Sequence, residues 1–166
     1  HHFPDGEIKV TLLGASETAI LYMPLDRPNT KLLTILLASE VLRRSGAQRV
    51  ILVAPYLCYM RQDVAFHPLE AVSQKVVGRL LASTVDRVIT FDAHLHRTAN
   101  LAAVFPRIET DNLSAMPVIA AALRRLSVHP STVIVGPDIE STPLARSLAE
   151  SLGCSFTVGT KIRRGD

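Results

Sequence analysis

Residues 50–67, VILVAPYLCYMRQDVAFH, determine the fold that we predict for this chain. The first five residues are apolar with no polar alternation, which is typical of a strand buried on both faces of a parallel sheet. Pro55 ends this strand, and aromatic and charged residues follow it. Because ligands of open α/β sheets bind just beyond the carboxyl ends of strands, the loop with Arg61, Gln62 and Asp63 is the first candidate for a functional site.

Strand and helix patterns alternate along the whole chain. Further strands are predicted at residues 8–13, 18–23, 88–91, 133–135 and 155–158, and helices at about 29–45, 68–81, 100–105, 114–126 and 142–152. A helix between two strands implies parallel pairing through a right-handed crossover. We therefore predict an α/β fold with a mostly parallel sheet and helices on both faces. Residues 129–132 are the best candidate boundary between two halves.

Composition limits the class of protein. A chain of 166 residues, 48% of them hydrophobic, is enough for one globular domain and part of a second. The net charge of +3 is small and the basic residues are scattered, which favours an anionic small molecule over nucleic acid as partner. Cys58 and Cys154 have neither disulfide-framework nor zinc-site spacing, so a reducing cytoplasm is expected.

Two further expectations come from the length of the apolar runs and from the first residues of the sequence. No apolar run reaches the roughly 18 residues of a transmembrane helix, so no membrane partner is expected. The chain begins with His1 and His2 instead of Met, so we expect an internal fragment.

Polar residues follow three predicted strands. They are Arg61, Gln62 and Asp63 after the first, Asp92 and His94 after the second, and Asp138 after the third. In one parallel sheet these three ends meet at one edge. An arginine fork suits phosphate, and carboxylates suit hydrated Mg²⁺, so the set fits a phosphate-rich ligand with magnesium.

Each of these assignments has a plainer alternative. Asp92 and His94 are also compatible with a capped strand end and a surface histidine. His67 and His96 are taken as solvated loop residues. Lys161 and Arg163, in K-x-R spacing, would place two cations on one face for phosphoryl transfer, but a basic terminus is usually a solvated tail.

Six segments, taken together, resemble the ribose-phosphate pyrophosphokinases, also called phosphoribosyl pyrophosphate synthetases. They are FPDGE at 3–7, PYLCYMRQD at 55–63, DAH at 92–94, TDNLSAMP at 110–117, VGPD at 135–138 and K-x-R at 161–163. The resemblance implies two phosphoribosyltransferase-like α/β domains. It implies an enzyme of nucleotide biosynthesis that moves the diphosphoryl group of ATP onto the C1 hydroxyl of ribose 5-phosphate, with Mg²⁺, releasing AMP.

The same resemblance assigns the nucleotide-binding residues. Phe3, Asp5 and Glu7 match a turn that reaches into a neighbouring subunit, where the aromatic ring stacks on adenine and the acids hydrogen-bond to it. Arg61 and Gln62 match the ATP-binding pair of the receiving subunit. A cytoplasmic homo-oligomer with nucleotide sites shared between subunits is therefore expected.

Five other residues match the metal and transfer groups of the family. His94, with Asp92 behind it, matches the histidine beside the triphosphate and magnesium. Asp138 matches the aspartate on a second magnesium near the ribose. Lys161 and Arg163 match the flexible-loop pair that stabilises the transferring diphosphoryl group.

The chain also departs from the family pattern. Residues 1–128 correspond to an N-terminal, ATP-side domain without its first strand and helix, and residues 129–166 to the beginning of the C-terminal domain. The loop DD-x-x-x-TGGT that holds ribose 5-phosphate is absent from the sequence, so we expect the chain alone to be inactive. Residues 139–143, IESTP, replace GG-x-KR, which argues against the usual regulation by phosphate.

Two alternatives remain open at this point. One is a non-catalytic relative that binds the enzyme as a regulatory subunit, and the other is a phosphoribosyltransferase. Retention of Arg61, His94, Lys161 and Arg163 favours catalysis. A phosphoribosyltransferase needs neither the FPDGE nor the RQD segment, so we rank it lower.

Overall fold

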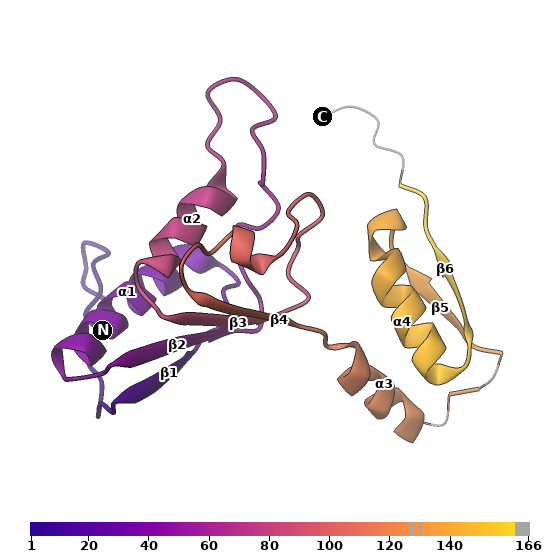
Figure 1. The fold of residues 1–166 in the computed structure, drawn as a ribbon, viewed down its shortest axis with the longest axis horizontal. Coiled ribbons are helices and arrows are strands. Elements are labelled where there is room, and N and C mark those ends of the chain that lie inside the picture. Colours follow the sequence, from indigo (N-terminus) through magenta and orange to yellow (C-terminus); the bar gives the residue numbers. More distant parts are fainter. Residues whose placement is uncertain (127, 130, 162–166) are drawn as a thin grey trace. The chain divides into compact units, whose positions relative to one another are not determined.

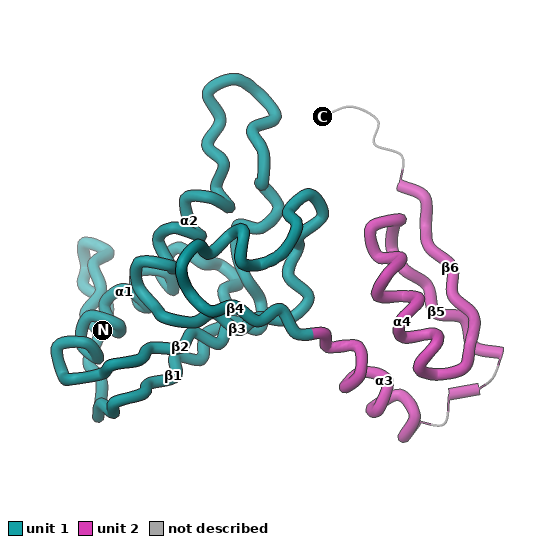
Figure 2. Tube along the Cα trace, viewed as in Figure 1, with its two compact units in different colours: residues 1–113 teal, residues 114–166 magenta. Residues whose placement is uncertain are grey.

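The structure, a computed structural model, describes residues 1–126, 128–129 and 131–161. It separates into two compact units, residues 1–113 and residues 114–166 (Figure 2). The elements of the first unit are β1 (Thr18–Tyr22), α1 (Pro28–Arg44), β2 (Arg49–Ala54), α2 (Ser73–Ala82), β3 (Arg87–Phe91), the 3₁₀ helix η1 (Leu101–Ala103) and β4 (Glu109–Leu113).

The first unit is built on a four-stranded parallel sheet in the order β1-β2-β3-β4 (Figure 1). Ile20 lies opposite Ile51, and Val53 lies opposite Ile89. Each of the first three strands is followed by a crossover that returns the chain to the amino edge of the sheet. The predicted α/β fold with parallel pairing is confirmed.

Helices α1 and α2 cover the same face of this sheet. Three right-handed crossovers that advance in one direction place their helices on one side, and β2 accordingly alternates between buried Val50 and Leu52 and half-buried Ile51. The core contains Leu32, Ile35 and Leu42 of α1, Val77 and Leu81 of α2, and Leu101, Val104 and Phe105 around η1. On the other face, Ile20 and Tyr22 are 66% and 68% exposed. The expectation of a strand buried on both faces is therefore wrong for β2, which alternates between buried and half-buried residues, and the helices described in this unit cover one face and not both.

The second unit contains a two-stranded parallel sheet. Its elements are α3 (Met116–Arg125), β5 (Val133–Gly136), the 3₁₀ helix η2 (Ile139–Ser141), α4 (Thr142–Leu152) and β6 (Ser155–Val158). Strand β5 pairs with β6, and Ile134 lies opposite Phe156. Helix α3 packs against α4, and Arg124 donates a hydrogen bond to the carbonyl of Ser151 in α4.

The compact units divide at a different place from the predicted boundary. Because α3 packs against α4, it belongs to the second unit, so the division falls between Leu113 and Ser114 and not near residue 129. The assignment of residues 1–128 and 129–166 to two phosphoribosyltransferase-like domains stays a prediction.

The structure differs from the sequence prediction at three places. Residues 8–13 were expected to form a strand, but only Ile8 pairs, in a single antiparallel bridge with His2. Helix α2 begins at Ser73, so Pro68 and Glu70 lie in the preceding loop. Strand β4 was not expected, because its sequence ETDNL is polar.

Ion pairs explain how a polar sequence forms β4. Glu109 pairs with Arg49 of β2 at 2.6 Å, and Asp111 pairs with Arg87 of β3 at 2.6 Å. These arginines lie on the half-buried face of the sheet, away from the helices. The acidic residues of this strand thus pair with arginines of the adjacent β3 and of β2 beyond it, and need no apolar core.

Gly78 allows α2 to approach the segment after η1. A Cβ atom at this position would overlap the carbonyl oxygen of Val104. We therefore expect Gly78→Ala to lower the free energy of unfolding by about 1–3 kcal/mol, although alanine favours an isolated helix by about 1 kcal/mol. Urea unfolding followed by circular dichroism measures the change.

Val76→Ala is the matched control, because Val76 lies on the same helix and is half exposed. This variant should stay within about 1 kcal/mol of the wild type. A Gly78→Ala variant as stable as the wild type would show that α2 and the segment at Val104 do not pack closely.

Candidate functional site

The candidate site lies at the carboxyl edge of the four-stranded sheet, where the loops after β1, β2 and β3 begin. Each of these loops contains a non-glycine residue in the left-handed region: Arg27 at φ 48°, Tyr59 at φ 60° and Asp92 at φ 42°. Side chains at such φ values are strained, and strained residues concentrate at functional sites. These three residues lie at the edge that the sequence indicates, and two further residues with positive φ are Leu69, in the loop after β2, and Arg107, just before β4.

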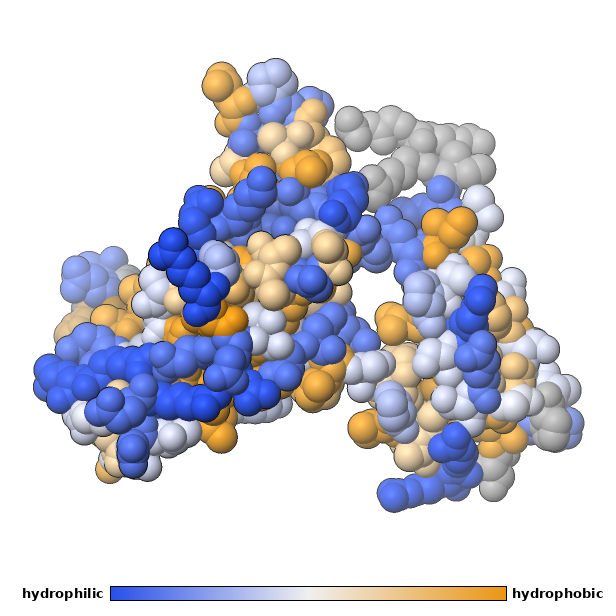
Figure 3. Space-filling model, viewed as in Figure 1, coloured by the Kyte–Doolittle hydropathy of each residue, from blue (hydrophilic) through white to orange (hydrophobic). Residues whose placement is uncertain are grey.

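The longest of these loops, residues 55–72, projects from the body of the first unit (Figure 1). Its surface is partly hydrophobic in Figure 3, and Phe66 and Leu69 are exposed. Leu57, Cys58 and Met60 at its base are buried in the core. Loop 55–72 therefore consists of a base that packs in the core and an outer part that is exposed to solvent.

Arg61 and Gln62 occupy the turn between this base and the outer part. Arg61 is exposed, and its guanidinium makes no hydrogen bond or ion pair with any residue in the described ranges. Gln62 is half-buried, and its Oε1 accepts a hydrogen bond of 2.6 Å from Ser73 Oγ at the start of α2. The turn thus presents a cation to solvent beside an oriented amide.

Asp63 is turned inward and paired. Its buried carboxylate accepts hydrogen bonds from Arg97 Nε at 3.0 and 3.1 Å and from Arg97 Nη2 at 2.5 Å. Hydrogen bonding to Arg97 lowers the pKa of Asp63, against the opposing effect of burial. Asp63 is therefore an ionised partner of Arg97 at neutral pH, and Arg97 is a residue that the sequence analysis missed.

The end of β3 places Asp92 and His94. Asp92 N donates to the Leu113 carbonyl at 2.9 Å, and Ala93 N donates to Asn112 Oδ1 at 2.9 Å, so β4 caps this strand end. The rings of His94 and His96 are nearly perpendicular, with centroids 3.8 Å apart. His94 Nδ1 and His96 Nε2 are 3.0 Å apart and share a hydrogen bond. His96 is an exposed loop residue, as predicted, and its ring also contacts His94.

Residues 1–9 form a hairpin that holds Phe3, Asp5 and Glu7. Gly6 N donates to the Phe3 carbonyl at 3.0 Å, and Gly6 has φ 93°, which only glycine adopts without strain. Asp5 Oδ1 accepts from Glu7 N at 3.1 Å, and the rings of His1 and Phe3 meet edge to face at 4.7 Å. The predicted turn is confirmed. Figure 1 shows the hairpin well apart from loop 55–72 of the same chain.

Asp138 lies in the second unit, after β5. The expectation that it shares a sheet edge with Arg61 and Asp92 is wrong, because β5 pairs with β6 in a separate sheet. Its Oδ1 accepts from Ser141 N at 3.2 Å, which caps η2. Lys161 is exposed beyond β6, and Arg163 lies outside the described residues.

The donor atoms at the edge suit a hydrated divalent cation. Mg²⁺ binds oxygen and retains several waters when phosphates supply the other ligands. Asp92 offers a carboxylate at the strand end, and His94 lies two residues further along the loop. The carboxylate of Asp92 thus suits a magnesium ion that is held largely by its phosphate ligand, and the ring nitrogen of His94 suits a hydrogen bond to a phosphate.

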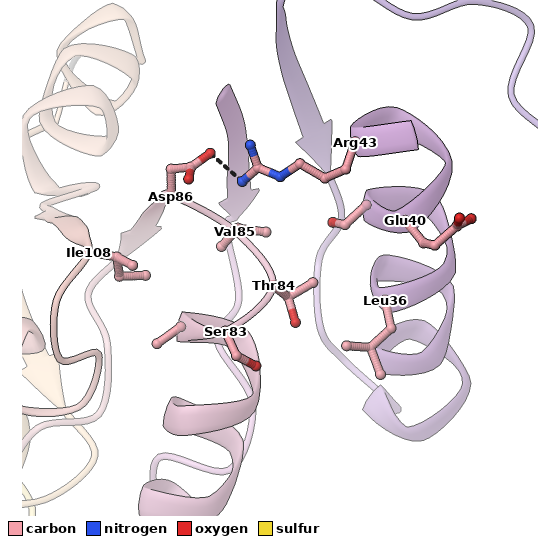
Figure 4. A pocket seen from close by; sticks show the side chains of 10 residues that line it. Leu36, Glu40, Arg43, Ser83, Thr84, Val85, Asp86 and Ile108 are labelled. Carbon is pink, nitrogen blue, oxygen red and sulfur yellow. Dashed lines mark hydrogen bonds and ion pairs between the residues drawn. The ribbon is translucent and has the colours of Figure 1, made fainter. Parts of the chain in front are cut away.

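Cavities lie at both edges of the sheet. One of about 400 Å³ lies at the carboxyl edge between Arg27, Asn29, Tyr56 and Tyr59, where Tyr59 Oη donates to Asn29 Oδ1 at 2.6 Å. The other, of about 360 Å³, lies at the amino edge between α1 and the turn that leads to β3 (Figure 4). Only the first belongs to the candidate site.

The second cavity has a structural explanation. In Figure 4 Arg43 of α1 reaches Asp86, and the ion pair measures 2.6 Å. Asp86 Oδ2 also accepts from Val50 N at 2.6 Å, so it ties the start of β2 to the start of β3. The cavity is the space left beside these two interactions of Asp86.

These features define an α/β protein with an open parallel sheet whose polar loops gather at the carboxyl edge. The family model described as the N-terminal domain of ribose phosphate pyrophosphokinase matches residues 1–84, half of the chain. The chain therefore belongs to the ribose phosphate pyrophosphokinase family.

Known proteins of this family align along almost the whole chain. A ribose-phosphate pyrophosphokinase of Methanobrevibacter smithii is 34% identical over 166 residues, which cover 98% of this chain and 54% of the relative. One of Rhizobium meliloti is 35% identical over 165 residues, with coverages of 97% and 52%. The chain spans about half the length of the curated relatives it matches.

A solved structure shares the fold. The crystal structure of phosphoribosylpyrophosphate synthetase from Mycobacterium smegmatis matches with a TM-score of 0.80 and 25% identity, covering 99% of this chain and 55% of that one. Within the described residues, the helices are too short or too polar to cross a membrane.

The packed base of loop 55–72 can be tested through its cysteine. Burial raises the pKa of the Cys58 thiol to about 11, whereas Cys154 is half-buried in the second unit. Because the thiolate is the reactive form, we expect Cys154 to react with a disulfide reagent at pH 8 at least about ten times faster than Cys58.

Peptide mapping after timed labelling measures the two rates, and labelling in urea is the control, because both thiols should then react alike. Equal rates in the native chain would show that the base of the loop is open to solvent.

Proposed function

We propose that this chain is the nucleotide-binding part of a ribose-phosphate diphosphokinase of nucleotide biosynthesis in the cytoplasm. The reaction transfers the diphosphoryl group of ATP to the C1 hydroxyl of ribose 5-phosphate and releases AMP. The observation that carries the proposal is the exposed guanidinium of Arg61, without a partner in the described ranges, beside an oriented Gln62 at the carboxyl edge. Membership of the family supports the same reaction.

In this proposal Arg61 binds a phosphate of ATP. A guanidinium presents two parallel N–H groups that match two phosphate oxygens. The hydrogen bond from Ser73 fixes the orientation of the Gln62 amide, so this amide is set to meet the nucleotide with little further ordering.

The hairpin completes the nucleotide site from a second copy of the chain. Phe3 stacks on the adenine, and Asp5 and Glu7 accept hydrogen bonds from it. The separation of the hairpin from loop 55–72 within one chain supports this arrangement, because one copy does not bring the two together (Figure 1). A homo-oligomer with shared sites follows from it.

Positioning and charge stabilisation are the main tasks of the protein in this reaction. The C1 hydroxyl of the sugar is the nucleophile, so no covalent enzyme intermediate is needed. Asp92, His94 and Asp138 would hold Mg²⁺, which supplies charge neutralisation at the phosphates. Lys161 and Arg163 would stabilise the charge that develops on the transferred group.

We also propose that the two parts of the chain belong to two phosphoribosyltransferase-like domains. Residues 1–128 would form the ATP side and residues 129–166 the beginning of the domain that holds ribose 5-phosphate. The length of the relatives, about twice that of this chain, is compatible with a second domain that is only begun here.

The role of Arg61 gives a direct test. In a protein of the relatives' full length that contains this chain, Arg61→Ala should raise the KM for ATP by about 10- to 100-fold, the value of one or two hydrogen bonds to a charged group. The KM for ribose 5-phosphate should change less than about two-fold, because the lost contacts are to the nucleotide alone. Steady-state AMP formation measures both.

Arg44→Ala is the matched control, because Arg44 is an exposed arginine whose ion pair joins it to Glu40 of its own helix. Equal effects of Arg61→Ala on both substrates would remove Arg61 from the nucleotide site. A wild-type protein that forms no AMP but binds an active homologue would support the regulatory alternative.

A further inference from the structure

We propose that Asp63, Arg97 and Gln74 form a loop clamp that holds the Arg61–Gln62 turn in place against the loop that carries His94. The inference rests on the proposed function and adds three positioning residues to it. None of the three needs to touch the nucleotide. Their role is to fix the backbone from which the nucleotide-binding side chains extend.

The first part of the loop clamp is the ion pair between Asp63 and Arg97. The two residues are 34 positions apart in sequence, and three hydrogen bonds join their side chains. The Asp63 side chain is 5% exposed and the Arg97 side chain is 52% exposed. Without its partner, the carboxylate would lack solvation by water, whereas the guanidinium would keep it. The Arg97 guanidinium also lies over the Phe66 ring, 5.3 Å from its centroid.

The second part is the buried amide of Gln74 in the first turn of α2. Its Nε2 donates to the Met60 carbonyl at 3.4 Å, and its backbone N–H donates to the Gln62 carbonyl at 3.1 Å. Its Oε1 accepts from Thr98 Oγ1 at 3.0 Å. One residue therefore bonds to the chain on both sides of Arg61 and to the loop after β3.

The position of these bonds indicates what they do. Loop 55–72 has no helix or strand of its own, and its outer part is exposed. An arginine on a mobile turn would have to be ordered when the nucleotide binds, at a cost in conformational entropy. Bonds on either side of Arg61 remove most of this cost beforehand.

The burial of Asp63 predicts an asymmetry between the two partners. Removing the charge of Arg97 leaves a buried carboxylate without its cation, which is strongly unfavourable. Removing the charge of Asp63 leaves a half-exposed arginine that water can solvate. Arg97→Gln should therefore be more harmful than Asp63→Asn, and the double variant should be less harmful than Arg97→Gln alone.

The first measurement needs no nucleotide. Hydrogen exchange of the amides of residues 60–66, measured in the chain itself, should become at least about ten times faster in Arg97→Gln and should fall back towards the wild-type rate in Arg97→Gln with Asp63→Asn. The control pair, Arg44→Gln and Glu40→Gln, breaks an exposed ion pair on α1 and should leave these rates unchanged. Unchanged rates in Arg97→Gln would overturn the loop clamp.

The second measurement is the KM for ATP in a full-length protein that contains this chain. Arg97→Gln should raise it about ten-fold with kcat changed less than about three-fold, and the double variant should recover part of the loss. A higher KM without faster exchange would mean that Arg97 binds the nucleotide directly, which would overturn its positioning role. Faster exchange with an unchanged KM would show that loop order does not affect the nucleotide site.

The two measurements separate the inference from the function on which it rests. Failure of the wild-type protein to bind ATP would refute the proposed function, whatever the exchange rates show. Partial rescue in the double variant excludes simple misfolding, because a chain that fails to fold would not be restored by a second substitution at the buried partner.

Discussion

Parallel pairing of four strands in the order of the sequence is the constraint on which the rest of the first unit depends. Because every crossover is right-handed and advances in the same direction, α1 and α2 lie on one face and the loops after β1, β2 and β3 reach one edge. A slip of one residue in register would turn Val50, Leu52 and Val88 away from the helices. The same pairing that forms the core therefore places Arg61 and Asp92 at neighbouring strand ends.

Local sequence was sufficient to predict the elements that are stabilised by local contacts or by burial of apolar side chains. Strands β2 and β3 contain short apolar runs, β6 alternates polar and apolar residues, and α1 and α4 are bounded by proline near their first turn and glycine after their last. Strand β4 could not be predicted in this way, because Glu109 and Asp111 are stabilised by arginines of two other strands. Residues 8–13 show the opposite case. Their alternation of apolar and polar residues is typical of a strand, but among them only Ile8 pairs, with His2.

The same distinction applies to the candidate site. Arg61 and Gln62 follow a buried strand, so topology alone was enough to select them. The pairing of Asp63 with Arg97 depends on how two loops fold over each other, which no spacing rule contains. The contact of His94 with His96 depends on the local backbone of a single loop, which has no regular secondary structure. Asp138 was placed at the wrong edge because the partner strand of β5 is a property of the whole fold and not of residues 133–138.

Helix α2 limits how the loop after β3 can move. Gln74 and Gly78 are four residues apart and thus lie on one face of the helix, and the first bonds to Thr98 while the second packs against the carbonyl of Val104. Leu101 and Phe105 of the same segment are buried in the core. The loop after β3 is therefore anchored on α2, and a shift of this helix would be transmitted to the segment that follows His94.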